Sequence, residues 1–152
     1  MSMADTARLT QAAAPVQIAA SVASAASLIL GAAGFVPWVV HDHGDLEFSG
    51  LGSTAELLGV FQVSMLHNII HLAFGVVGLA MALAVYSARN YLIGAGVLYV
   101  VLWAFGVLVG EKGSGNFIPV NIADDWLHFV LGGAMLVLGL GMATRDQSAK
   151  TH

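Results

Sequence analysis

Two histidines of this chain stand in a four-point pattern that occurs twice. In the first copy Asn68 lies three residues before His71, and a glycine follows four residues after the histidine. In the second copy Asp125 and His128 repeat this spacing, again with a glycine four residues later. Each copy opens a long apolar run, and ionisable side chains placed in hydrocarbon are usually retained for a function. The duplicated pattern is therefore where chemistry is expected.

Metal binding is one chemistry that suits these residue types. His67 precedes His71 by four residues, so both imidazoles leave the same face of a helix. Asp124 precedes His128 by the same interval. If the two helices face one another, three imidazole nitrogens and one carboxylate oxygen form a set that suits zinc, copper or iron. The amide and the carboxylate of the repeated pattern, Asn68 and Asp125, would then hold the imidazole tautomers.

Three other uses of the same histidines stay open. His71 and His128 could ligate a haem or another tetrapyrrole from both faces, with the following glycines making room for the ring. The polar side chains could instead hydrogen-bond across the bundle and tie the helix ends together, since a carboxylate near a helix N-terminus is stabilised without any catalytic role. A proton relay is the third use. Against it, the inner halves of the apolar stretches hold almost no polar residue, so a path would stop halfway.

No other part of the chain shows a catalytic pattern. His41 and His43 alternate with aspartates in an acidic loop that could collect a metal ion, although such loops are more often only solvated. The chain has no cysteine, which excludes thiolate ligands and disulfides. A nucleophile elbow, a Ser-His-Asp order and a glycine-rich phosphate loop are all missing. We therefore expect no intrinsic catalysis unless a metal or cofactor supplies it.

The elements that must position these residues are membrane-spanning helices. Of the 152 residues, 58% are hydrophobic and only 9% are charged, against about 25% charged in soluble domains. Four apolar stretches are long enough to cross about 30 Å of hydrocarbon. They cover residues 16–40, 57–86, 91–110 and 122–143. An acidic outer loop fills 41–53, and the sequence does not decide whether 55–66 continues the second helix or forms a separate interfacial helix.

Basic residues indicate how the helices are oriented. Arg8, Arg89, Arg145 and Lys150 lie at the N-terminus, between the second and third stretches, and at the C-terminus, while only Lys112 lies on the other side. Because basic residues in short loops stay in the cytoplasm, both termini are predicted to be cytoplasmic. Each motif histidine lies 17 or 18 positions before the next arginine, which is about 26 Å of helix. Both histidines are thus expected at one depth near the outer surface.

The duplication also predicts the architecture. Two helical hairpins that start on the same side give an all-α, integral membrane four-helix bundle made of two parallel repeats. Ser53 to Glu56 resembles a capping box that starts the second helix, and Asn121 with Asp124 resembles one that starts the fourth. Small residues after each histidine predict close helix contacts. The histidines are therefore expected to face protein and not lipid.

Two segments around the histidines resemble those of a known family. They are Val63-Ser-Met-Leu-His-Asn-Ile-Ile-His-Leu and Asn116-Phe-Ile-Pro-Val-Asn-Ile-Ala-Asp-Asp-Trp-Leu-His. Both are similar to segments of a bacterial family of small four-helix membrane proteins catalogued as a domain of unknown function, and the resemblance covers about 15–143. It implies a four-span fold in a bacterial inner or plasma membrane. It implies no reaction.

Composition and resemblance together predict a structural or accessory subunit of a membrane assembly, with the lipid bilayer and other subunits as its partners. The alternative is a metal- or haem-binding membrane protein whose site lies near the outer surface, between the second and fourth helices. No basic patch is present, so nucleic acid is not an expected partner.

Overall fold

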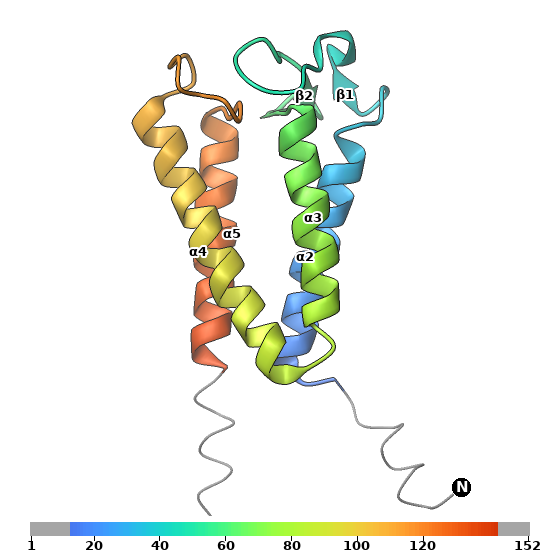
Figure 1. The fold of residues 1–152 in the computed structure, drawn as a ribbon, viewed down its shortest axis with the longest axis vertical. Helices are drawn as coiled ribbons and strands as arrows, with labels where there is room; N and C mark the ends of the chain where they lie inside the picture. Colours follow the sequence, from blue (N-terminus) through green and yellow to red (C-terminus); the bar gives the residue numbers. More distant parts are fainter. Residues whose placement is uncertain (1–12, 143–152) are drawn as a thin grey trace, which may run out of the picture.

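The computed structural model describes residues 13–142, which form four helices and a small three-stranded sheet (Figure 1). The helices are α2 (Pro15–Ala33), α3 (Met65–Met81), α4 (Val85–Val109) and α5 (Ile122–Gly141). Between α2 and α3 lie β1 (Val40–His41), the short 3-10 helix η1 (His43–Asp45), β2 (Glu56–Leu57) and β3 (Phe61–Gln62). The predicted all-α bundle is confirmed, with the sheet as a small addition at one end.

The helices pair as two hairpins. Helix α2 packs along α3, and α4 packs along α5 (Figure 1). The hairpins meet at the end opposite the sheet, where α2 begins and α5 ends, and they separate toward the sheet. The buried core between them lies near their meeting point and includes Ala20, Leu92 and Met135. That the hairpins are two copies of one repeat stays a prediction.

The outer surfaces of the helices suit a membrane. Helices α2, α4 and α5 are each long and apolar enough to cross a bilayer, and α3 is a shorter apolar helix of 17 residues. Large apolar side chains such as Ile29 and Val137 are 67% and 71% exposed. Helices that are apolar on all sides belong in hydrocarbon or in a protein core. The chain is a membrane protein whose helices contact lipid.

The predicted start of the second helix, at residue 57, is wrong. Residue 57 belongs to β2, which pairs with β3 in antiparallel fashion, and Leu57 lies opposite Phe61. The intervening turn has positive φ at Leu58 and Gly59, 57° and 67°. A right-handed helix cannot contain such residues. Residues 55–64 are thus neither a helical extension nor a separate interfacial helix, and 65–66 are the first two residues of α3.

The true start of α3 lies at Ser64, which has extended backbone and whose hydroxyl accepts a hydrogen bond from the His67 amide. Ser53, the predicted cap, instead donates to the Val63 carbonyl at 2.6 Å within the sheet region. The predicted cap of the last helix is confirmed, because Asn121 accepts from the Asp124 amide and Asp124 accepts in return. One of the two capping signals was therefore genuine.

The connection between the second and third helices also differs from the prediction. Helix α3 ends at Met81 and α4 already begins at Val85, so the boundary expected at 86–91 lies inside α4. Ser87 explains the short turn, because its hydroxyl donates to the carbonyls of Met81 and Ala84. Arg89 consequently lies on the first turns of α4. Its guanidinium donates to the Gly139 carbonyl near the end of α5.

The first and last helices end earlier than predicted. Helix α2 ends at Ala33, well before residue 40, and α5 ends at Gly141. The basic residues at 8, 145 and 150, on which the orientation partly rests, lie outside the described residues. The orientation across the membrane therefore stays a prediction.

Candidate metal centre

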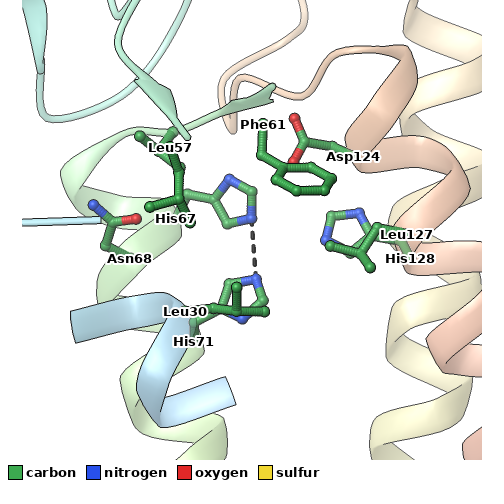
Figure 2. A pocket seen from close by; sticks show the side chains of 10 residues that line it. Leu30, Leu57, Phe61, His67, Asn68, His71, Asp124, Leu127 and His128 are labelled. Carbon is green, nitrogen blue, oxygen red and sulfur yellow. Dashed lines mark hydrogen bonds between the residues drawn. The ribbon is translucent and has the colours of Figure 1, made fainter. Parts of the chain in front are cut away.

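The three histidines are held by the two helix starts next to the sheet. His71 and His128 are each the seventh residue of their helix, α3 and α5, and His67 lies one turn before His71. Since Ser64 and Asn121 fix where these helices begin, they also fix the level of the imidazoles. Figure 2 shows the three rings turned toward the space between the two hairpins. The predicted convergence of His67, His71 and His128 is what the structure shows.

The imidazoles are buried and close together. His67, His71 and His128 are 5%, 7% and 1% exposed, and one nitrogen from each ring lies within 4.8 Å of the other two. The Nε2 atoms of His67 and His71 are 3.1 Å apart. The ring of His128 lies 5.7 Å from that of His67 and 6.2 Å from that of His71, centre to centre. Three nitrogens from two different hairpins thus surround one point.

Hydrogen bonds leave several of these nitrogens without a partner. The contact between His67 and His71 is the one hydrogen bond in the cluster. The Nδ1 atoms of His71 and His128 are buried without a partner, and His128 makes no side-chain hydrogen bond within residues 13–142. A buried polar group without a partner costs about 1–3 kcal/mol. Within that range His128 is hydrogen-bonded through neither nitrogen, and an ion bound to one of them is one explanation for such a group in a native protein.

Asp124, the predicted fourth ligand, has a different place. Its Oδ2 accepts hydrogen bonds from the amides of Gln62 and Asn121, both at 3.0 Å. Gln62 belongs to β3, so this carboxylate joins the sheet to the start of α5. Asp124 lines the same cavity as the histidines, above them in Figure 2, but it is not in the group whose ligand atoms lie within 4.8 Å. Asp124 therefore links the two hairpins through a hydrogen bond.

Asn68 and Asp125 do not support the imidazoles, contrary to the prediction. The Asn68 amide donates to the Gly34 carbonyl at the end of α2, at 2.7 Å, and points away from the histidines in Figure 2. Asp125 lies against Gly106 of α4, and its Oδ1 is buried without a hydrogen bond in the described part of the chain. Both residues face the preceding helix of their own hairpin. The repeated pattern thus combines a histidine that faces the other hairpin with a polar residue that packs within its own hairpin.

The space among the histidines is small. A cavity of about 20 Å³ is lined by the three histidines, Asp124 and apolar side chains that include Phe61 and Leu127. A volume of this size holds about one water molecule or ion. It does not hold a tetrapyrrole. The glycines expected to make room for such a ring are instead in contact with other helices. Gly75 packs on α2 at Ser24 and Leu28, and Gly132 packs on α4.

Tyr99 belongs to the surroundings of this centre, and the sequence analysis missed it. Its ring on α4 lies 5.4 Å from that of His128 and 6.0 Å from that of His71, and it is 2% exposed. Its hydroxyl is 3.1 Å from that of Ser27 on α2. One signal was available, since Tyr99 lies near the middle of its apolar stretch, where an interfacial aromatic residue is not expected.

The loop histidines are not part of a comparable group. Within residues 13–142, the histidines of α3 and α5 form the one group of three potential ligand residues whose ligand atoms lie within 4.8 Å of one another. His41 packs on Gly59 beside the sheet, and His43 lies in η1. A metal site in this loop stays a prediction without geometric support.

Comparison with known proteins places the chain in a family. Residues 17–141 match the family described as "Domain of unknown function (DUF4383)". The chain belongs to the DUF4383 family. The match includes all four helices apart from the first two residues of α2, and therefore also the histidine cluster. No curated protein and no solved structure matches the chain. Membership in DUF4383 confirms the resemblance to an uncharacterised family but assigns no reaction to the centre.

Proposed function

We propose that this DUF4383 protein binds a transition-metal ion, zinc or copper, through His67, His71 and His128. The observation that carries the proposal is the state of His128. This imidazole is 1% exposed, makes no side-chain hydrogen bond within the described residues, and lies beside two further buried imidazoles. Nitrogen ligands of this kind are the ones that zinc and copper prefer.

The spacing of the nitrogens supports this assignment. Two imidazoles bound tetrahedrally to zinc at about 2.0–2.1 Å have ligand atoms about 3.3 Å apart. The Nε2 atoms of His67 and His71 are 3.1 Å apart. His128 has a nitrogen within 4.8 Å of both, so a small rotation of its side chain completes a three-histidine set. A cavity of about 20 Å³ at this point leaves room for the ion.

A hydrogen-bonded clasp, in which polar side chains bond across the bundle and tie the helix ends together without an ion, explains the cluster less well. It accounts for His67 and His71, which contact each other, but it gives His128 no partner. Asp124 lines the same cavity, but its side-chain hydrogen bonds come from the Gln62 and Asn121 backbone amides and none joins it to His128. An ion shared by the three rings supplies what the clasp lacks.

The site would lie near one surface of the membrane. The histidines occupy the first two turns of α3 and α5, beside the sheet and opposite to the start of α2. With both termini in the cytoplasm, as the basic residues predict, this end faces the extracytoplasmic side. Three protein ligands leave one position of a tetrahedral ion for water or a substrate, so the centre could serve sensing or chemistry. This function is compatible with a role as an accessory subunit, because exposed apolar helices suit lipid and other subunits equally.

Metal analysis of the purified full-length protein in mild detergent tests the proposal. We expect about one zinc or copper ion per chain after loading and removal of excess metal. Cobalt-loaded protein should show the visible absorption of a tetrahedral nitrogen-ligated ion, and copper-loaded protein should show nitrogen couplings in its electron paramagnetic resonance spectrum. His128→Gln should lose both the stoichiometric ion and these spectra.

His43→Gln is the matched control, because it removes a histidine from the loop at the same end of the molecule. It should keep the ion and the spectra of wild type. If neither metal can be loaded into the wild-type protein, or if His128→Gln and wild type bind the same amount with the same spectra, the proposed site does not exist.

A further inference from the structure

A second and larger cavity lies between the two hairpins. It is a cleft of about 310 Å³ bounded by α2, α4 and α5. Small side chains on facing helices keep it open, namely Ala19, Ala23 and Ala26 on α2 and Ala134 on α5. Val22 and Leu138, which also line it, are 64% and 37% exposed on the lipid-facing surface. A molecule dissolved in the bilayer can therefore reach the cleft sideways.

The cleft contains two hydroxyl groups in otherwise apolar walls. Ser27 and Tyr99 line it and are 4% and 2% exposed, and their oxygens are 3.1 Å apart. Whichever hydroxyl donates in this contact, the hydrogen of the other one has no acceptor among residues 13–142. Buried hydroxyl groups are normally satisfied. The spare hydrogen is thus available to an acceptor that enters the cleft.

The walls also limit the charge of an occupant. Among residues 13–142, no Asp, Glu, Lys, Arg or His lines the cleft. Burying an ionised head group without a partner of opposite charge is costly, so carboxylates, phosphates and ammonium groups do not fit this environment. A neutral oxygen, as in an alcohol, an aldehyde or an ester, needs only the one hydrogen bond that the pair offers.

We propose that this cleft binds one neutral, single-chain lipid, with its hydroxyl or carbonyl oxygen on the Ser27–Tyr99 pair and its hydrocarbon chain along the alanine-lined part of α2. The volume is at the lower end of the range of about 300–1,000 Å³ found for ligand pockets. It therefore suits one chain and not a two-chain phospholipid. Leu30 lines both this cleft and the histidine cavity, so the two sites adjoin each other. The lipid site itself does not depend on a metal.

Photocrosslinking tests the inference on the full-length protein in lipid vesicles. The probe is a sixteen-carbon alcohol with a diazirine in its chain and a terminal alkyne for detection. We expect saturable labelling that maps to peptides of α2 and α5 at the cleft. Unlabelled hexadecanol should compete, and hexadecanesulfonate, which has the same chain and a permanent charge, should not.

Two variants locate the site. Ala23→Leu fills the cleft and should abolish saturable labelling, whereas the control Ala80→Leu, at an exposed position of α3, should label like wild type. The double variant Ser27→Ala/Tyr99→Phe removes both hydroxyls, and with them the donor, and should weaken the probe's affinity about threefold to tenfold. Equal labelling of Ala23→Leu and wild type, effective competition by the sulfonate, or stronger labelling by a two-chain phospholipid probe would overturn the proposal. Metal content measured on the same samples shows whether the histidine site fails or stands independently.

Discussion

Replacing His128 by leucine separates a metal site from a hydrogen-bonded clasp, because the two hypotheses predict opposite changes in stability. Without metal, His128 is a buried imidazole that makes no side-chain hydrogen bond in the described part of the chain. Leucine has a similar volume and no polar group to satisfy. Removing an unpaired buried polar group should stabilise the metal-free protein by about 1–3 kcal/mol. At about 2–4 °C per kcal/mol for a chain of this size, the midpoint of thermal unfolding should rise by several degrees.

Adding metal should reverse this order. An ion present at a hundred times its dissociation constant stabilises the folded wild type by about 2.7 kcal/mol, or about 5–11 °C in the unfolding midpoint. His128→Leu has lost a ligand and should show little response at the same metal concentration. The two proteins are compared by thermal unfolding in the same detergent, once with a chelator and once with zinc.

The control for this experiment is His43→Leu, which makes the same change in the loop. It should follow wild type under both conditions. A metal-free His128→Leu that is less stable than wild type, together with an unchanged response to zinc, would refute the metal site and support the clasp.

Three further predictions follow from particular contacts. Gly75→Ala should destabilise the protein by about 1–3 kcal/mol, because the new methyl group would meet the Ser24 carbonyl oxygen at 2.8 Å, whereas Gly133→Ala has open space and should be neutral or stabilising in the same unfolding assay. Asp124→Ala should lower the free energy of unfolding by about 0.5–2 kcal/mol, because its bond to the Asn121 amide at the helix cap is lost. The variant should still bind one metal ion per chain by elemental analysis. Loss of the ion would show that Asp124 is a ligand. Ser64→Ala should cost about 1 kcal/mol in thermal unfolding, since this residue caps α3; an unchanged midpoint would contradict that helix start.

Much of the site could be predicted because helix periodicity and hydrophobicity act locally. The spacing of His67 and His71 placed both imidazoles on one face, and the small residues that follow the histidines indicated close helix contacts, so that the histidines face protein. Both expectations agree with their burial in the structure. The cap formed by Asn121 and Asp124 is also a local feature, since it involves four consecutive residues, and it was recognised correctly.

The parts that were missed depend on contacts between distant segments. The strands β1, β2 and β3 have two residues each, and their pairing links Val40 to Leu57 across the acidic loop. No periodicity can reveal strands of that length. Tyr99 was missed for a similar reason, because it lies 29 positions before His128 on the neighbouring helix and meets His71 only when the second hairpin packs on the first.

Asn68 illustrates an error that geometry could have prevented. Successive residues of a helix are rotated by about 100° around its axis, so a residue next to His67 cannot share its direction. Asn68 accordingly points to α2, where its amide binds the Gly34 carbonyl. Its matching position in the second half, Asp125, lies against α4 in the same way. Regular spacing in a sequence therefore identifies equivalent positions but not a common target for their side chains.

The difference between the two copies of the motif explains how a three-histidine centre is assembled. His67 and Asp124 occupy the same position, four residues before the motif histidine, yet one contributes a buried imidazole and the other a carboxylate bound to the β3 backbone. The sheet that β3 belongs to is formed by the segment between α2 and α3, so this bond ties the first hairpin to the second at the end where they otherwise separate. The Asn121 side-chain amide donates to the Val60 carbonyl and the Gly50 amide to the Phe117 carbonyl, so the Asp124 bond is one of several that join the two hairpins beside the histidines. The position that carries a buried imidazole in the first copy thus carries, in the second, a contact between the two hairpins.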